Sequence, residues 1–322
     1  MSMELRKLAE GVEIRPFVLG TNVIGWTCDE EKSARILDRF VDYGFDAIDT
    51  AESYSDWVAG HVGGESERTI GRWMKNRPGM RQKVKIIDKV GWIDTCDGSF
   101  LGHADKKYII SHCDAALQKL GTDYIDALLV HAPDPLTPVN ESIEALEYLK
   151  KEGKILSYGC SNYDGKQLRN ALNVSQAKGT PMYQIIEPCF NLVDREDYER
   201  NLRPVVEEAG MSVVTFYSLA GGFLTGLYKK PEDLTRDNPR YRILSHYCTE
   251  RNFEIIRILD EAAAGLGVSD QEVALAWHMQ ARSITAPISS AIEESHVDSF
   301  YKAATLELPK EVIAALDKAS EY

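Results

Sequence analysis

Four polar residues that follow short apolar runs have side chains suited to proton transfer. They are Asp49, Tyr54, Lys89 and His131. A tyrosine works as a general acid near neutrality only when its pKa, ordinarily about 10, falls by roughly two to three units. A lysine ammonium beside the phenol oxygen favours the phenolate and would supply that shift. The set indicates an acid–base site if the fold brings these side chains together.

The elements that must position these residues alternate along the chain. Short apolar strands are expected at 17–20, 45–49, 84–88, 125–130, 155–160, 182–186, 212–217 and 284–288. Amphipathic helices are expected at 30–43, 66–75, 105–120, 139–152, 164–178, 198–209, 251–266 and 270–280. The pattern predicts an α/β fold: a single (β/α)8 barrel domain spanning residues 1–322, with an N-terminal β-hairpin and extra C-terminal helices. In such a barrel, polar residues at the carboxyl ends of strands face one mouth.

A doubly wound nucleotide-binding sheet is the alternative fold. It requires Gly-x-Gly-x-x-Gly after the first strand, and the sequence has no such motif. The nearest approach, residues 265–270, lies between two expected helices.

Composition narrows the classes of function. A net charge of −13 argues against general affinity for nucleic acid or anionic membranes. The sequence has no apolar run long enough to span a membrane, and residues 1–10 lack a signal-peptide core. Six scattered cysteines are interpreted as reduced thiols of a cytoplasmic protein, and the seven histidines form no cluster typical of a metal site.

Four short motifs occur in a characteristic order. They are Asp49-Thr50-Ala51 with Tyr54, Lys89-Val90-Gly91, His131-Ala132-Pro133-Asp134 and Gly159-Cys160-Ser161-Asn162. With these motifs in this order, the chain resembles the aldo-keto reductases. The resemblance extends from about Leu19 to the C-terminal helix. Residues 54–67 are similar to a bacterial-type branch, and the chain is also similar to potassium-channel beta-subunit-like members.

The resemblance implies a reaction and a role for each of these residues. An aldehyde or ketone would be reduced to an alcohol with NADP(H), with NAD(H) as the other possible cofactor. Tyr54 would be the general acid, assisted by Lys89, while Asp49 would hold Lys89 and His131 would orient the substrate oxygen.

The resemblance also implies cofactor-binding residues. Ser161, Asn162 and Gln184 would bind the nicotinamide carboxamide, and Tyr217 would lie against the nicotinamide ring. The remaining implied contacts are Thr21, Asn22, Asp49, Ser218, Leu219, Gly221, Arg236, Ser290 and His296. Arg236 belongs to an irregular segment, 219–246, in which basic residues outnumber acidic ones. That balance suits an anionic dinucleotide, but it also suits an ordinary solvated loop.

The chain departs from the family pattern at three places. The proline usual after Ser218 is missing, and Asp88 stands where threonine is usual. Strand alternation turns Asp88 away from the face of Lys89. Residues 287–294 lack the basic residue often found near the adenosine 2′-phosphate and contain two glutamates instead. The preference for NADP(H) is therefore inferred from the family alone.

Three tryptophans follow the first three expected strands. Trp26, Trp57 and Trp92 are expected to form an aromatic wall of a substrate pocket, although any one of them could instead pack a loop.

Two other functions remain open. The first is a cofactor-binding, redox-sensing regulatory subunit with little turnover. The second is a barrel hydrolase or aldolase, with Lys89 as a Schiff-base lysine in the latter.

Overall fold

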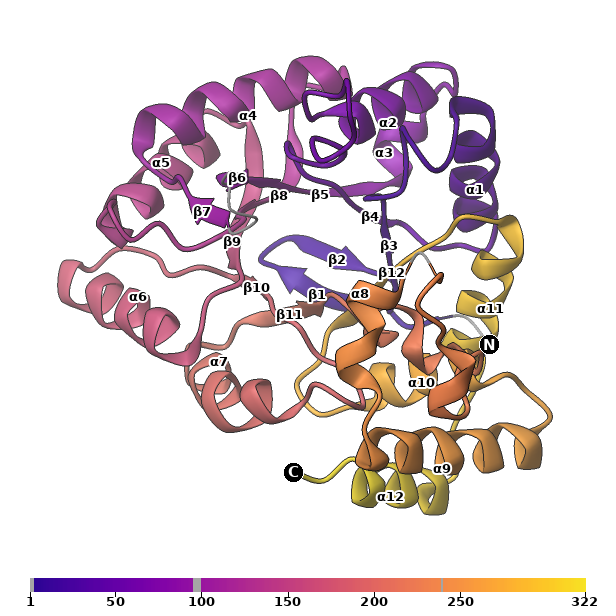
Figure 1. Ribbon diagram of the computed structural model, residues 1–322. Helices are drawn as coiled ribbons and strands as arrows, with labels where there is room; N and C mark the ends of the chain where they lie inside the picture. The colour runs from indigo at the N-terminus through magenta and orange to yellow at the C-terminus, as the bar shows by residue number, and fades with distance from the viewer. Residues whose placement is uncertain (1–2, 95–99, 239) are drawn as a thin grey trace.

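The computed structural model describes residues 3–94, 100–238 and 240–322, and in this part of the chain eight parallel strands close into a barrel (Figure 1). The strands are β3 (Val18–Gly20), β4 (Ala47–Asp49), β5 (Lys85–Val90), β8 (Ile125–Val130), β9 (Ile155–Ser161), β10 (Ile185–Glu187), β11 (Ser212–Thr215) and β12 (Ala286–Ser290). Each strand pairs with the next in chain order, and β12 pairs with β3 to close the ring. The predicted (β/α)8 barrel is confirmed.

Helices surround the barrel in Figure 1. The longer ones are α1 (Glu30–Asp42), α2 (Glu65–Lys75), α4 (Lys106–Leu120), α5 (Val139–Lys151), α6 (Gly165–Lys178), α7 (Arg203–Ala209), α9 (Glu250–Leu266), α10 (Asp270–Gln280), α11 (Glu294–Thr305) and α12 (Lys310–Ala319). The shorter ones are α3 (Met80–Lys83), α8 (Tyr241–Leu244), the π-helical turn η1 (Tyr198–Leu202) and the 3-10 turns η2 (Ala220–Thr225), η3 (Pro231–Asp233) and η4 (Ser245–Tyr247). Local signals fix their ends. The Asp164 side chain caps the first turn of α6, and Gly121 ends α4 in the left-handed conformation.

An antiparallel hairpin of β1 (Arg6–Ala9) and β2 (Val12–Ile14) closes the amino-terminal end of the barrel. Its apolar side chains, including Leu8 and Ile14, join the barrel interior in one buried cluster. The backbone carbonyl of Lys7 accepts a hydrogen bond from Ser212, the first residue of β11. Because the hairpin covers this end, the open mouth of the barrel is at the carboxyl end of the strands.

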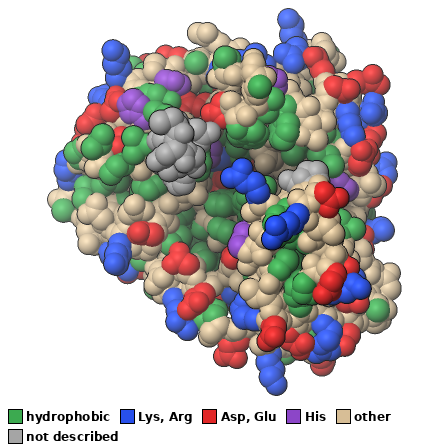
Figure 2. Space-filling view, in the orientation of Figure 1, with side chains coloured by type: hydrophobic (Ala, Val, Ile, Leu, Met, Phe, Trp, Pro, Cys, Tyr) green, Lys and Arg blue, Asp and Glu red, His purple; other side chains and the backbone are tan. Residues whose placement is uncertain are grey.

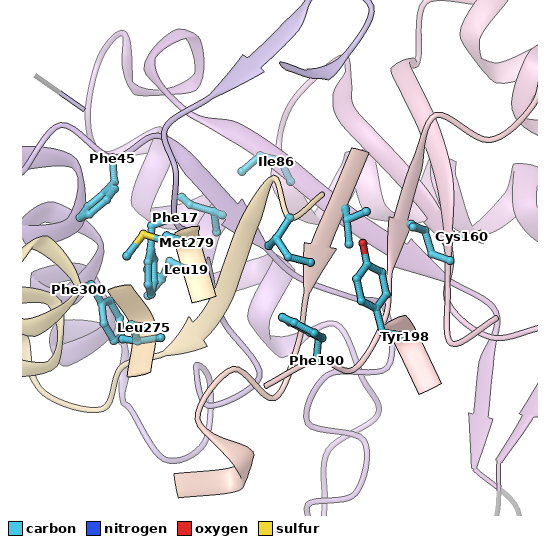
Figure 3. Close-up of a cluster of buried hydrophobic side chains, with 14 of the residues drawn as sticks. Phe17, Leu19, Phe45, Ile86, Cys160, Phe190, Tyr198, Leu275, Met279 and Phe300 are labelled. Atoms are coloured by element: carbon cyan, nitrogen blue, oxygen red, sulfur yellow. The ribbon is translucent and has the colours of Figure 1, made fainter. Parts of the chain in front are cut away.

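A second apolar layer lies between the barrel and its helices. Figure 3 shows part of it, where the Phe17 and Phe300 rings stack with centroids 4.5 Å apart. Phe45 packs beside Phe17, with 5.7 Å between ring centroids. This layer joins strands to helices that are distant in sequence, and it holds the strand ends at fixed positions.

Some details differ from the sequence-based expectation. A two-stranded hairpin of β6 (Trp92–Asp94) and β7 (Phe100–Gly102) stands after β5 and was not predicted. Strand β10 begins three residues later than expected and ends one residue later, at Glu187. The five cysteines within the described residues are free thiols, and Cys96 lies outside them.

Two kinds of feature are absent from the described residues. None of the helices found there is long and apolar enough to cross a membrane. Over the same residues, no group of three or more His, Cys, Asp or Glu side chains is arranged to hold a metal ion.

Candidate active site

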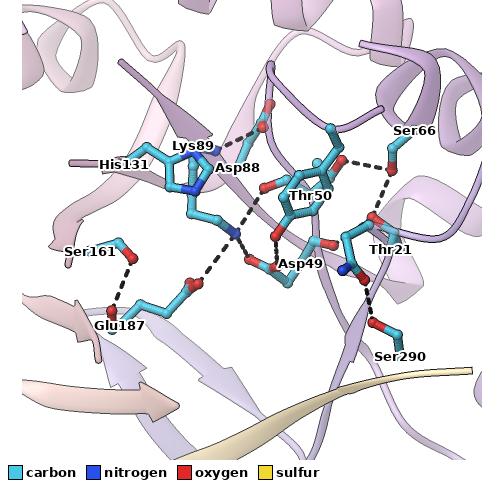
Figure 4. Close-up of polar contacts among 12 residues, drawn as sticks. Thr21, Asp49, Thr50, Ser66, Asp88, Lys89, His131, Ser161, Glu187 and Ser290 are labelled. Carbon is cyan, nitrogen blue, oxygen red and sulfur yellow. Dashed lines mark hydrogen bonds and ion pairs between the residues drawn. The ribbon is translucent and has the colours of Figure 1, made fainter. Parts of the chain in front are cut away.

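Three of the sequence-predicted residues meet at the carboxyl end of neighbouring strands. Asp49 is the last residue of β4 and forms a buried ion pair with Lys89 of β5. The Tyr54 hydroxyl donates a hydrogen bond of 3.0 Å to Asp49 Oδ2. Lys89 Nζ also donates to the Thr50 carbonyl oxygen at 3.1 Å. Figure 4 shows the lysine ammonium at the centre of these contacts.

A second acid belongs to this cluster and was not predicted. Glu187, the last residue of β10, places Oε1 3.4 Å from Lys89 Nζ, and both side chains are almost completely buried (Figure 4). A signal for it was present in the sequence. Glu187 ends an apolar run with a charged residue, just as Asp49 does.

Burial changes the expected acidity of Tyr54. The sequence-based expectation was a lowered pKa, but burial raises the pKa of the Tyr54 phenol well above its ordinary value, and the nearby Asp49 carboxylate raises it further. Lys89 acts in the expected, lowering direction and is outweighed. In this state Tyr54 is therefore held as a protonated donor.

The cluster keeps Lys89 charged. Burial lowers the pKa of the ammonium, but Asp49 and Glu187 outweigh burial, so the Lys89 pKa lies well above its ordinary value. A Schiff-base lysine needs an unprotonated amine to attack a carbonyl. The surroundings of Lys89 thus disfavour the aldolase alternative.

His131 follows β8 and faces the same space. It is 8% exposed, and its Nδ1 has no hydrogen-bond partner among the described residues. Burial, together with the Lys89 charge, lowers the pKa of His131 well below its ordinary value. The imidazole is therefore neutral, with one ring N–H able to donate to a substrate oxygen.

The residues expected near the nicotinamide separate into two groups. Ser161 Oγ donates to the Glu187 carbonyl oxygen at 2.9 Å, and Asn162 Nδ2 donates to the His131 carbonyl oxygen at 2.9 Å. Asn162 has a φ of 60°, which is uncommon for a residue other than glycine and is often found at functional sites. These two residues adjoin the catalytic cluster.

Gln184 is not brought to this cluster. It precedes β10, and its backbone pairs with Tyr158 in the middle of β9 and with Ser212, the first residue of β11. Its side chain lines a hollow beside Lys7 of the hairpin. The expected nicotinamide contact of Gln184 therefore does not fit its place at the opposite end of the barrel.

The segment after β11 forms a second wall of the mouth. Tyr217 has a φ of 58° and is 45% exposed, and its carbonyl oxygen accepts a hydrogen bond from Asn191. Ser218 is buried and donates to the Ile288 carbonyl oxygen at 2.8 Å, which ties this segment to β12. The tyrosine ring is thus presented by a backbone that is fixed on both sides.

The turn after Ser218 has an exposed basic edge. Leu219 leads into η2, where Gly221 is left-handed, and Arg240 donates to the Gly221 carbonyl oxygen at 2.7 Å. Arg236 is exposed on the same irregular segment.

The remaining expected contacts lie around β12 and α11. Ser290 hydrogen-bonds to the exposed Asn22 side chain, and His296 Nδ1 accepts from the Ile292 N–H. Thr21 is fully buried and donates to the Asp49 carbonyl oxygen at 2.6 Å, so it supports β4 and does not face the mouth.

The two glutamates of the segment 287–294 are paired with cations. Glu293 forms an ion pair with Lys32, and Glu294 forms one with Arg35. These pairings reduce the negative charge that an anionic cofactor would meet there.

The three tryptophans form an aromatic rim beside the cluster. Trp26 and Trp57 meet edge to face at 6.2 Å, and Trp57 lies 6.3 Å from the Tyr54 ring. Trp92 packs 4.9 Å from His131, on the other side of the tyrosine. Trp26 and Trp57 are each about half exposed. The space-filling view of this face is hollowed near its centre, with hydrophobic side chains along its walls (Figure 2).

Asp88 faces the helical layer, as strand alternation predicts. The strand residue Ile87 joins the barrel interior, whereas Ile86 and Val90 join the outer apolar layer with the alternate face. Burial and the neighbouring Glu67 of α2 raise the Asp88 pKa well above its ordinary value. Within the described residues, the hydrogen bond between Asp88 and the site comes from the Lys89 backbone N–H, which donates to the Asp88 carboxylate at 2.8 Å.

A barrel with this set of residues at its mouth defines a class of oxidoreductase. The family model described as the Aldo/keto reductase family matches residues 16–321. The chain belongs to the aldo/keto reductase family.

The chain is similar to several proteins whose names state different activities. The chain is 31% identical to aldo-keto reductase YhdN of Bacillus subtilis, over 74% of this chain and 71% of the relative. It is 27% identical to L-glyceraldehyde 3-phosphate reductase of Escherichia coli O157:H7, over 89% of this chain and 83% of the relative. It is 26% identical to a probable voltage-gated potassium channel subunit beta of Arabidopsis thaliana, over 99% and 96% respectively.

Proposed function

We propose that this protein reduces an aldehyde or ketone to an alcohol with NADP(H), and that Tyr54 donates the proton. The observation that carries the proposal is the buried linkage of Tyr54 to Asp49 and of Asp49 to Lys89 at the carboxyl end of the barrel. This linkage supplies a protonated phenol and holds the lysine cation near it.

Each residue has a physical task in this proposal. Tyr54 gives its proton to the carbonyl oxygen as negative charge develops there. The resulting phenolate is stabilised by the Lys89 ammonium, whose position Asp49 fixes. Neutral His131 donates a hydrogen bond that orients the substrate oxygen.

The nicotinamide cofactor, when bound, supplies the hydride. Ser161, Asn162 and Tyr217 would hold its nicotinamide end. Ser161 and Asn162 border the cluster, and Asn162 and Tyr217 have left-handed backbones. Gly221 with Arg240, and the exposed Arg236, would face its phosphates. Asn22, Ser290 and His296 would lie toward the adenosine. We propose NADP(H) as the preferred cofactor, with NAD(H) as the second candidate.

The direct test follows the absorbance of NADPH and of NADH with a panel of aldehydes and ketones. We expect turnover of at least one carbonyl compound and a higher kcat/KM with NADPH. Tight NADPH binding with no turnover across the panel would contradict the proposal and would favour a regulatory, redox-sensing subunit.

A further inference from the structure

Glu187 gives the catalytic lysine a second carboxylate. Lys89 Nζ forms an ion pair with Asp49 and lies 3.4 Å from Glu187 Oε1, and all three side chains are at most 3% exposed. Glu187 Oε2 has no hydrogen-bond partner among the described residues. The site therefore contains two buried acids and a single cation in direct contact with them.

The charges of this cluster do not balance when both acids are ionised. His131 is neutral and Tyr54 is a protonated phenol, so one ammonium would face two carboxylates. An uncompensated buried charge is costly, and two acids that share one site respond by retaining one proton between them.

The groups packed about Glu187 come from several elements. Asp49 belongs to β4, Lys89 to β5, Tyr54 to the loop after β4, and His131 follows β8. On the neighbouring strands, Ser161 of β9 lies opposite Glu187 and Val214 is the interior residue of β11, and neither ionises in the relevant range.

We propose that Asp49 and Glu187 share one proton beside Lys89, and that loss of this proton as pH rises switches off proton donation by Tyr54. This inference rests on the proposed function of Tyr54. Glu187 is a positioning residue in this scheme, because it acts on the reaction only through Lys89 and Asp49.

The direction of the effect follows from charge. With the shared proton present, Lys89 and the two acids together carry no net charge, and the phenolate left by Tyr54 brings the cluster to one negative charge. Without the proton, the same step brings it to two negative charges beside a single cation, so proton donation becomes harder. Burial and the negative Asp49 raise the pKa of Glu187 to about 8, so the switch falls within an accessible range.

The test compares the wild-type protein with Glu187→Gln, because the amide keeps the shape of a protonated acid and cannot ionise. We expect kcat/KM of the wild-type enzyme, with NADPH saturating, to fall by roughly tenfold per pH unit above about pH 8. In Glu187→Gln this fall should begin at least about one pH unit higher. Glu67→Gln is the matched control, because Glu67 is a fully buried glutamate paired with Lys119 outside the barrel, and its profile should follow the wild type.

A second readout needs neither cofactor nor turnover. Infrared difference spectra of the cofactor-free protein, recorded across this pH range, should show the carbonyl stretch of a protonated carboxylic acid disappearing with a midpoint near pH 8. This component should be missing in Glu187→Gln and present in Glu67→Gln. Asp88, whose pKa burial and Glu67 also raise, would give its own component, which should persist in Glu187→Gln.

The outcomes separate the two proposals. A wild-type enzyme with no break in its pH profile, or one whose break is unchanged in Glu187→Gln, would overturn the switch. A wild type that lacks the component with a midpoint near pH 8 would overturn the shared proton even if Glu187→Gln failed to fold. A wild-type protein that shows this component but turns over no carbonyl compound would refute the proposed function and leave the shared proton standing.

Discussion

The Tyr54 hydroxyl and the Asp49 carboxylate are joined by a 3.0 Å hydrogen bond, while the same carboxylate pairs with Lys89. One acid thus holds both the proton donor and the cation that stabilises its conjugate base. Because burial and the Asp49 carboxylate keep the Tyr54 pKa high, the tyrosine rests as a protonated donor. The lysine is needed at the moment when the proton leaves.

Asn162 and Gln184, the two residues predicted to contact the nicotinamide carboxamide that lie at opposite ends of the barrel, give a matched pair of variants. We expect Asn162→Gly to weaken NADPH binding by roughly tenfold, because it removes a side-chain amide at the mouth and glycine accepts the left-handed backbone. Gln184→Ala should leave the Kd unchanged. Fluorescence titration with NADPH measures both, and equal losses in the two variants would show that the effect does not come from cofactor contact.

Acid stability should depend on His278. This buried imidazole is hydrogen-bonded to Thr215, and burial lowers its pKa from 6.5 to about 3. Its folded pKa is below its unfolded pKa, so its contribution to stability is complete above pH 6.5 and is lost as pH falls toward 3.

Urea unfolding at a series of pH values tests this dependence. In that window His278 should add up to about 1.4 kcal/mol per pH unit to the slope of the unfolding free energy. The slope should be shallower in His278→Gln, while His131 contributes equally to both proteins. Parallel curves for the two proteins would show that His278 is not buried in its neutral form.

The aromatic rim predicts a preference among carbonyl compounds. Trp57→Ala should cost roughly 1–3 kcal/mol of transition-state binding for a bulky aromatic aldehyde and much less for a two- or three-carbon aldehyde. The reason is that the Trp57 ring lies against Tyr54 and Trp26 and offers a half-exposed apolar face to a ring-shaped substrate. The ratio of kcat/KM values for the two substrates measures the preference, and the same loss for both would assign Trp57 to packing.

The barrel could be predicted from sequence because its signals are local and repeated. Each buried strand of the site ends close to a polar residue, and the helices carry caps and glycine stops that can be read in a single window. Asp49, Lys89 and His131 were placed correctly at one mouth for this reason. The β6–β7 hairpin was missed because it follows β5 immediately, with no helix to mark a boundary.

Glu187 and Gln184 show where such patterns fail. Strand β10 has only three residues, and the apolar residues before it extend the apparent strand by three positions. Because of that shift, Gln184 was predicted as a site residue and Glu187, the acid that does belong to the site, was missed.

The prediction of a lowered pKa for Tyr54 failed for a different reason. The direction of the pKa shift depends on the balance between burial and two opposite charges. Residue types alone do not give the distances on which that balance depends.

The central claim is that Tyr54 donates the proton, and the most direct measurement is the kcat/KM of Tyr54→Phe for the best carbonyl substrate. Tyr108→Phe is its control, because Tyr108 is also a tyrosine that donates to a carboxylate, that of Glu52, but it belongs to α4. The account predicts that Tyr54→Phe loses roughly 10²–10⁴-fold in kcat/KM while its Kd for NADPH is unchanged, and that Tyr108→Phe retains near wild-type turnover. Turnover by Tyr54→Phe within a few-fold of the wild type would contradict it.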